Sequence, residues 1–277
     1  MKAILKKILQ QLAIYHPLQT FYRGCIAAAN NHYYKLIYSK YKGKGFTCNF
    51  CHATYQQFVP EYPYPAIVDA INTNQVIAGY GSNVYCPNCM SKNRERLVLA
   101  VIENTLTIHN KKILHFSPEK NLYNYLSSKA NVTSVDIVPG FYKKIDNDIS
   151  YADATNLQFK TGSFDIIIAN HILEHIPDDI AAMKEICRVL QPTGVAILQV
   201  PYSEKLTTTI EEQHINNPAK QEQLFGQKDH VRIYALTDYV NRLIKSGFTV
   251  TVLSPTILAQ YAIHAIQPNE SVILCYK

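Results

Sequence analysis

The sequence predicts an α/β fold in which helices cover both faces of a mostly parallel β-sheet, with a small cysteine-bearing module ahead of it. From residue 93 onward, β-rich apolar runs alternate with segments of helical periodicity, a pattern typical of parallel strands joined by helices. Four of the seven cysteines lie in two Cys-x-x-Cys pairs that precede this region. The 277 residues, 47% of them hydrophobic, can form one α/β domain and a smaller appendage.

Residues 1–45 form the first predicted unit, a basic helical segment. The segment contains several Lys and Arg residues and no acidic residue, whereas the rest of the chain is almost balanced in charge. Apolar residues at helical spacing predict an amphipathic helix: Ile4, Leu5, Ile8, Leu9 and Leu12. Residues 1–15 would then contact a membrane surface or nucleic-acid phosphates, or pack onto the protein itself. The run Lys42-Gly-Lys-Gly45 predicts a short flexible joint.

Residues 46–92 form the second predicted unit, a zinc-ribbon-like module. It is rich in turns and aromatic residues and shows no sustained helical period. Cys48 and Cys51 form one cysteine pair, and Cys86 and Cys89 form the other. Four thiolates suit tetrahedral Zn²⁺ and leave no open coordination position, so we expect a structural zinc site. The alternative is two unrelated turns that carry free thiols.

Residues 93–277 form the third predicted unit, the α/β domain. A helix is expected at 93–106, because apolar residues recur there on one helical face. The alternating patterns then predict strands at 113–117, 132–138, 164–169 and 195–201, with helices at 118–129 and 178–190. The tail predicts a helix at 237–246 and strands at 249–253 and 271–276. The polar, weakly patterned segment 203–229 is expected to be a lid over the substrate.

Three motifs follow one another in residues 151–201. They read Tyr-Ala-Asp153-Ala-Thr-Asn-Leu, then Phe-Asp-Ile-Ile-Ile-Ala-Asn-His171-Ile-Leu-Glu-His175, then Arg-Val-Leu-Gln-Pro-Thr-Gly194. This combination resembles the class I S-adenosylmethionine-dependent methyltransferases with a type 11 methyltransferase domain, over roughly residues 95–277. The resemblance implies a Rossmann-like, seven-stranded sheet with S-adenosylmethionine at the carboxyl ends of its strands, where open α/β sheets bind their ligands.

The resemblance implies the residues that bind the adenosine half of the cofactor. Asp136, at the end of the second strand, would accept the ribose hydroxyls, with Ile137 beside it. Asp153 would accept the adenine amino group, and the Ala154 amide would read the neighbouring ring nitrogen. Asn170 and His171 would face the sulfonium methyl group. The alternatives are a solvated Asp136, a turn-forming Asp153 and a capped strand end at residues 170–171.

The first strand departs from the family pattern, because the run Ile113-Leu-His-Phe-Ser117-Pro-Glu119 has no glycine in the turn that follows the strand. A substitute is available, since Ser117 can cap a helix whose first residue is Pro118. The free backbone amides of that helix would bind the methionine carboxylate of the cofactor, and Glu119 would bind its ammonium group. A similar first strand occurs in a zinc-bearing bacterial subgroup of the family.

His230 is the candidate catalytic base. It lies in Asp229-His-Val-Arg232 ahead of the last predicted helix, where related methyltransferases often carry a His-x-Arg element near the substrate. Its ordinary pKa suits proton transfer near neutral pH, and a base is needed only for an acceptor that is protonated there. The alternative is a structural histidine that ties the lid to the sheet.

The leading hypothesis is therefore a methyltransferase that acts on a small molecule or glycan precursor, with S-adenosylmethionine and Zn²⁺ as cofactors. A second hypothesis is an RNA methyltransferase that grips RNA through its zinc module, although the segment between the cysteine pairs contains no Lys or Arg. A third is a non-catalytic protein that keeps the fold and has lost the cofactor. We expect a cytoplasmic protein, peripheral to a membrane if residues 1–15 bind lipid.

Overall fold

The computed structural model describes residues 31–212 and 214–277. The helix expected near the start of the chain, and with it the predicted contact through residues 1–15, lies outside the described residues. Residues 31–37 are helical and lead into a 3-10 turn, η1 (Ser39–Tyr41). No helix among the described residues is long and apolar enough to span a membrane.

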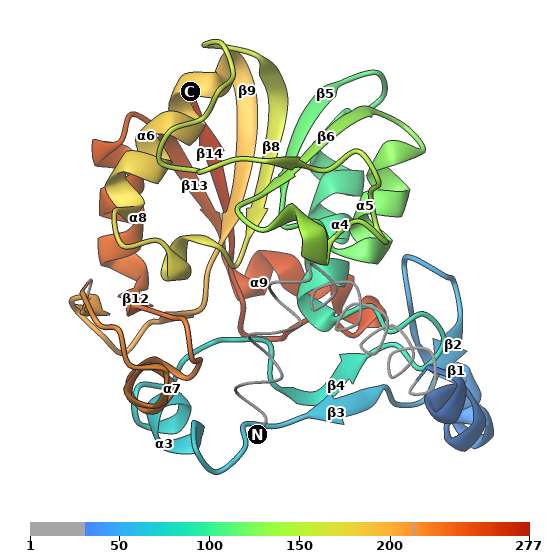
Figure 1. The fold of residues 1–277 in the computed structure, drawn as a ribbon. Coiled ribbons are helices and arrows are strands. Elements are labelled where there is room, and N and C mark those ends of the chain that lie inside the picture. Colours follow the sequence, from blue (N-terminus) through green and yellow to red (C-terminus); the bar gives the residue numbers. More distant parts are fainter. Residues whose placement is uncertain (1–30, 213) are drawn as a thin grey trace, which may run out of the picture.

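A seven-stranded sheet forms the centre of the molecule, in the order β13-β14-β9-β8-β5-β6-β7 (Figure 1). The five strands from β9 to β7 are parallel, and β14 is antiparallel to both of its neighbours. The predicted seven-stranded, mostly parallel sheet is therefore confirmed. Its strands are β5 (Lys112–Phe116), β6 (Asn131–Asp136), β7 (Ser150–Tyr151), β8 (Phe164–Asn170), β9 (Leu190–Gln199), β13 (Thr249–Leu253) and β14 (Val272–Tyr276).

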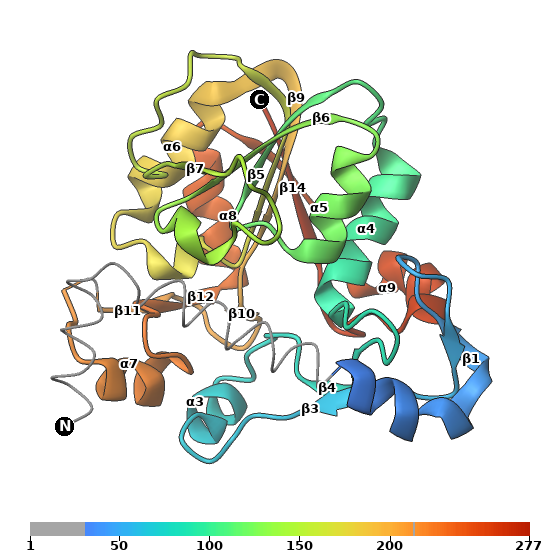
Figure 2. The same cartoon turned by 45° about the vertical axis from the view of Figure 1, so that its right-hand side comes forward.

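Helices cover both faces of this sheet, as Figure 2 shows. On one face lie α4 (Asn93–Thr105) and α5 (Lys120–Ser127), and on the other lie α6 (Asp179–Val189) and α8 (Leu236–Lys245). Because side chains alternate along a strand, Ile166 and Ile168 pack toward α4 and α5, while Ile167 packs toward α6 and α8. The central strands are thus buried on both faces, which explains their almost continuous apolar sequences.

The cysteine-bearing module is built from two small antiparallel sheets. β1 (Lys42–Thr47) pairs with β2 (Thr54–Tyr55), and β3 (Val59–Glu61) pairs with β4 (Gly81–Tyr85); a short helix, α3 (Val68–Thr73), lies between β3 and β4. The prediction of a flexible joint at 42–45 is wrong, because these residues belong to β1. Gly45 has a φ of +94°, and its left-handed backbone allows the strand to bulge opposite Tyr55.

The predicted lid segment contains structure that its sequence did not indicate. A three-stranded sheet joins β10 (Tyr202–Ser203), β11 (Ile210–Glu211) and β12 (Arg232–Ala235), and α7 (Pro218–Phe225) precedes β12. α7 contacts α3 of the cysteine module, and both helices lie below the seven-stranded sheet in Figure 1. The lid segment and the cysteine module therefore meet at one end of the sheet. The remaining elements are η2 (Pro139–Phe141), η3 (Leu173–His175), α9 (Pro255–Leu258) and η4 (Ala259–His264).

Candidate active site

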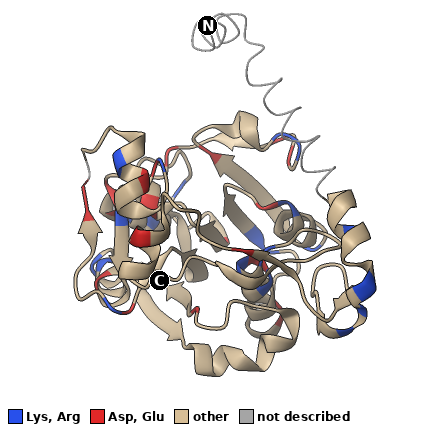
Figure 3. Cartoon of the chain, turned by 90° about the horizontal axis from the view of Figure 1, so that it is seen from below, with Lys and Arg blue, Asp and Glu red and all other residues tan. Residues whose placement is uncertain are grey.

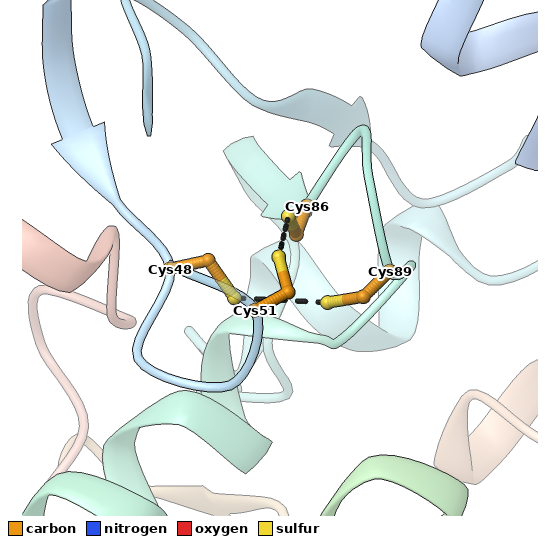
Figure 4. Close-up of side chains that lie close together, drawn as sticks. All are labelled: Cys48, Cys51, Cys86 and Cys89. Carbon is orange, nitrogen blue, oxygen red and sulfur yellow. Dashed lines mark hydrogen bonds between the residues drawn. The ribbon is translucent and has the colours of Figure 1, made fainter. Parts of the chain in front are cut away.

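The four predicted cysteine ligands converge in one cluster, with each sulfur close to a sulfur of the other pair (Figure 4). The Sγ atoms of Cys48 and Cys89 are 3.6 Å apart, and those of Cys51 and Cys86 are 3.7 Å apart. Zn–S bonds of about 2.3 Å in a tetrahedron place the sulfurs roughly 3.8 Å apart, so the spacing fits Zn²⁺. The donor set and the distances both suit this ion.

The two cysteine pairs lie on turns that share the same backbone hydrogen bond and a left-handed residue at the same position. In the first turn, the Cys48 amide donates to the Ala53 carbonyl, and His52 adopts a φ of 58°. In the second turn, the Cys86 amide donates to the Ser91 carbonyl, and Met90 adopts a φ of 59°. His52 thus serves the turn backbone and is not part of the four-sulfur cluster.

Arg96 joins the cysteine module to the α/β domain. It is fully buried on α4, and its guanidinium donates to backbone carbonyls from three parts of the chain. The acceptors are the carbonyls of His264 (2.7 Å), Ala265 (2.7 Å), Val84 (3.1 Å), Asn83 (3.2 Å) and Ser91. Arg96 therefore serves the backbone of its own chain, whereas Arg94, two residues earlier, lines two cavities.

A cavity of about 630 Å³ lies at the carboxyl ends of β5, β6 and β8. Its walls bring together Asp136 with Ile137 and Asp153 with Ala154, the residues expected to bind adenosine. Asp136 accepts hydrogen bonds from the Ser117 hydroxyl (2.5 Å) and the Val138 amide (2.6 Å). Each carboxylate oxygen can accept a second bond, so Asp136 keeps capacity for a ligand.

Asp153 also forms a turn, which was the alternative considered for it. Its Oδ1 accepts from the amide (2.9 Å) and the hydroxyl (2.8 Å) of Thr155. Its carboxylate still lines the cavity, because the turn fixes the side chain at the cavity wall. The turn and a binding role are therefore compatible at this residue.

The turn that follows β5 differs from the predicted turn in the position at which its helix begins. α5 begins at Lys120 with Glu119 as its N-cap residue, so the predicted helix cap at Ser117 with Pro118 as first helical residue is wrong. Ser117 instead has a φ of 45°, in the left-handed region that glycine adopts easily, and its hydroxyl bonds Asp136. The serine thus makes the backbone bend for which relatives use glycine, and its hydrogen bond helps to hold that conformation.

Glu119 lies in a second cavity of about 390 Å³, beside the first. His115 Nε2 lies 3.0 Å from one carboxylate oxygen of Glu119, and the Asn170 amide donates to the other at 3.2 Å. Burial raises the pKa of Glu119, but its bond with His115 outweighs burial and leaves the pKa below its ordinary value. Cys89, Met90 and Arg94 form the facing wall, so the cysteine module closes this cavity.

His171 lies where these two cavities meet a third, smaller cavity of about 160 Å³. It follows β8 directly, with a φ of 55° that turns the chain at the strand end. Burial lowers the pKa of His171 to about 4, so its ring is neutral at pH 7. The third cavity extends to Tyr80 and Lys92 of the cysteine module and to Gly226 after α7.

His230 lies in the wall of the third cavity, 7% exposed. Its Nδ1 donates to the Phe225 carbonyl at 3.2 Å, a contact that ties α7 to this wall as the structural alternative supposed. Its Nε2 lies 3.8 Å from Oε1 of Glu174. Burial also lowers the pKa of His230. The ring is therefore a neutral imidazole whose Nε2 carries a free electron pair.

Glu174 and His175 were not among the site residues expected from the sequence, and they form η3 together with Leu173. Their side chains, however, line the third cavity together with His230. Burial raises the pKa of Glu174, but the surrounding imidazoles outweigh it and lower the pKa to about 2. The sequence signal was the close succession of His171, Glu174 and His175, since residues three and four apart on a tight turn share one side.

Comparison with known proteins matches part of this chain to methyltransferases. Residues 119–198 match the type 11 methyltransferase domain family. A demethylmenaquinone methyltransferase of Staphylococcus epidermidis is 31% identical over an alignment of 80 residues. The alignment covers 26% of this chain and 33% of that enzyme. The chain thus matches about one third of the length of this relative.

Two solved structures with methyltransferases illustrate the structural similarity. A chain from the complex of the Haloferax volcanii Trm112 methyltransferase activator with a putative methyltransferase has a TM-score of 0.47 and 14% identity, covering 65% of this chain and 88% of that one. An S-adenosylmethionine-dependent methyltransferase of Mesorhizobium loti has a TM-score of 0.46 and 17% identity, covering 65% and 98%. Residues 119–198 of this chain are thus similar to a methyltransferase domain, and the chain folds into a seven-stranded sheet preceded by a four-cysteine cluster.

Proposed function

We propose that this protein transfers a methyl group from S-adenosylmethionine to a small polar acceptor. The observation that supports the proposal is the meeting of three cavities at His171, at the carboxyl ends of the parallel strands. Two of the cavities suit the two halves of the cofactor, and the third remains for the acceptor. His171 would then border the adenosine half of the cofactor, its methionine half and the acceptor.

The first cavity, of about 630 Å³, suits the adenosine half of the cofactor. The Asp136 carboxylate is held at its mouth by Ser117 and can accept from two ribose hydroxyls. Ile137 supplies an exposed apolar side chain beside it, and Asp153 with Ala154 lies on the facing wall. Apolar walls with a few fixed polar groups are typical of small-ligand sites.

The second cavity suits the methionine half. Glu119 is ionised and held by His115 and Asn170, so it can bind the cofactor ammonium group. Arg94 of α4 lines the same cavity and can bind the carboxylate, a role that the sequence hypothesis gave to backbone amides. A charged side chain next to the cysteine module thus takes the place of the glycine-rich loop.

When bound, S-adenosylmethionine supplies a methyl group on a positively charged sulfur, which is a good leaving group. The protein therefore contributes mainly by holding the acceptor in line with the methyl group and by excluding water. Asn170 and His171 border the junction where the methyl group would lie. For an acceptor that must lose a proton, His230 Nε2 is the candidate base, because Phe225 holds Nδ1 in its protonated form.

The small volume and mixed charge of the third cavity favour a small polar acceptor, such as a metabolite or a glycan precursor. Lys92, Arg94 and Arg232 line it together with Glu61 and Glu174. Figure 3 shows basic and acidic positions in several separate groups along the described chain, whereas RNA binding typically uses a continuous basic surface.

Calorimetry with S-adenosylmethionine tests the cofactor proposal. We expect one binding site, and we expect Asp136→Ala and Arg94→Met each to weaken it at least tenfold. Asp148→Ala is the matched control, since it removes an exposed carboxylate that does not line these cavities. No binding to the wild-type chain would refute the proposal and leave the non-catalytic alternative.

The acceptor is tested with methyl-labelled cofactor and a fractionated cell extract. We expect label in the small-molecule fraction, and we expect ribonuclease treatment to leave the incorporation unchanged. Incorporation into an RNA fraction that disappears after ribonuclease treatment would overturn the small-acceptor proposal.

We further propose that the four-cysteine cluster binds one structural Zn²⁺. The sulfur spacing supports this, as does the absence of an open coordination position in a four-sulfur shell. In the zinc-loaded chain, we expect these four thiols to resist alkylation until a chelator is added. Equal alkylation with and without chelator would contradict the proposal.

A further inference from the structure

Glu174 has unusual surroundings for a carboxylate that is only 1% exposed. Three imidazole nitrogens face its Oε1 at distances too long for good hydrogen bonds: His171 Nδ1 at 3.6 Å, His230 Nε2 at 3.8 Å and His175 Nε2 at 4.0 Å. Among residues 31–212 and 214–277, neither carboxylate oxygen of Glu174 has a hydrogen-bond partner, and neither does either ring nitrogen of His171. A buried carboxylate without partners is costly, so this arrangement calls for a bound species.

The orientation of the histidines indicates what that species is. His175 directs its Nδ1 at Asp229, with 3.4 Å between Nδ1 and Oδ1, and His230 donates its Nδ1 proton to the Phe225 carbonyl. In both residues, the outer nitrogen is therefore held by an oxygen acceptor while Nε2 faces Glu174. This is the arrangement of metal-binding histidines, in which a second interaction fixes the tautomer and the ring orientation.

The distances also suit a metal ion. One ligand atom from each of Glu174, His175 and His230 lies within 4.8 Å of the other two. An ion with bonds of about 2.1 Å holds its ligand atoms roughly 3 to 4 Å apart, so small side-chain movements would complete the shell. A catalytic base requires only one of these nitrogens, whereas three that face a single carboxylate are more than proton transfer needs.

We propose that Glu174, His175 and His230 bind a divalent transition-metal ion. Imidazole with carboxylate suits Fe²⁺, Co²⁺ or Zn²⁺ better than Mg²⁺ or Ca²⁺. The site is separate from the four-cysteine cluster and lies on the wall of the third cavity. Three protein ligands leave positions free in an octahedral shell, and these would bind an oxygen of the acceptor.

This last step rests on the proposed function, because it makes the acceptor an oxygen compound, such as one with a hydroxyl group beside the reacting atom. The cation site itself does not depend on methyl transfer. The two roles of His230 exclude each other: with the cation bound, Nε2 is a metal ligand, and its role as a base applies only to the metal-free site.

Cobalt titration of the full chain tests the site, after the cysteine cluster has been filled with one equivalent of Zn²⁺. We expect one equivalent of Co²⁺ to bind with visible d–d absorption and without the thiolate-to-cobalt charge-transfer band that cysteine ligands give. Glu174→Gln and His230→Gln should each weaken binding at least tenfold, and Asp229→Asn by about 10- to 100-fold, as expected for a residue that orients a ligand. The exposed His109, changed to Gln, is the matched control and should leave binding unchanged.

Thermal unfolding and bound zinc, measured on the same variants, show whether each variant is folded. Failure of Co²⁺ to bind, binding only with a charge-transfer band, or equal binding to folded Glu174→Gln would overturn the cation site. Calorimetry with S-adenosylmethionine on the same samples separates the two proposals. Cofactor binding without Co²⁺ binding refutes only the cation site, and Co²⁺ binding without cofactor binding refutes only the methyltransferase proposal.

Discussion

Replacing Arg96 with methionine tests how the cysteine module is joined to the α/β domain. Methionine keeps much of the length of the side chain but removes the guanidinium, whose donors serve five backbone carbonyls in a fully buried setting. Hydrogen bonds from charged donors contribute about 1.5 to 3 kcal/mol each, but a buried guanidinium also costs several kcal/mol in lost hydration. We therefore expect a net loss of about 3 to 5 kcal/mol in the free energy of unfolding, as when a buried charge network loses one partner.

The assay is urea and thermal denaturation of the zinc-loaded chain. For a domain of this size, the expected loss corresponds to a fall of about 10 °C in Tm. Arg94→Met is the matched control on the same helix, because Arg94 Nε has no hydrogen-bond partner among the described residues. It should cost less than about 1 kcal/mol, typical of a site outside the core network. If Arg96→Met also stays within about 1 kcal/mol of the wild type, the carbonyl bonds only offset the cost of burying the charge, and the reasoning is refuted.

Three further perturbations have expected outcomes. Burial raises the pKa of Glu270 from 4.5 to about 7, so its stabilising contribution is complete below pH 4.5 and is lost as the pH rises through 7. Between pH 5 and pH 8, urea unfolding should show the wild type losing roughly 2 to 3 kcal/mol more stability than Glu270→Gln, while Glu95, whose pKa burial also raises to about 7, adds to the fall in both proteins; parallel pH profiles would contradict this. Gly45→Ala should lower stability by about 1 to 3 kcal/mol, because its Cβ would lie 2.8 Å from the Gln56 Cα. At Gly43, which also has a positive φ, an added Cβ would meet no atom of the described residues within 4 Å. Gly43→Ala should therefore cost less in the same thermal assay, and equal costs would rule out the steric cause. Chelation of zinc should lower both Tm and the affinity for S-adenosylmethionine, and an unchanged affinity in calorimetry would show that the module does not support the cofactor site.

The central strands and their helices could be predicted because burial on both faces imposes a strong sequence pattern. The strand expected at 164–169 is β8 (Phe164–Asn170), and the helix expected at 178–190 is α6 (Asp179–Val189). α3 and α7 were not predicted, because neither imposes a strong sequence pattern. Each is eight residues or shorter, and α7 has a largely polar sequence, so its stability depends on contacts with distant parts of the chain.

The grouping of the site residues was likewise predictable in part. Parallel strands end at the same edge of a sheet, so Asp136 and Asn170 had to lie near each other. The conformation of Ser117 was not predictable, because a left-handed serine is held there by its bond to Asp136. The place of Arg94 in the site was not predictable from the sequence either, since it depends on how the cysteine module packs against the domain.

That packing also explains how the domain can do without a glycine-rich first loop. In a domain with such a loop, the backbone itself approaches the methionine end of the cofactor. Here the corresponding cavity is closed by Cys89, Met90 and Arg94, and the Asn121 side chain donates to the Cys89 carbonyl at 3.3 Å. Two turns that meet at a four-sulfur cluster hold this wall in place, and Arg96 fixes the same module to the helix that carries Arg94. In the proposed function, the cysteine cluster is therefore a structural part of the cofactor site, and loss of the proposed zinc ion should affect binding at the methionine end before it affects the adenosine end.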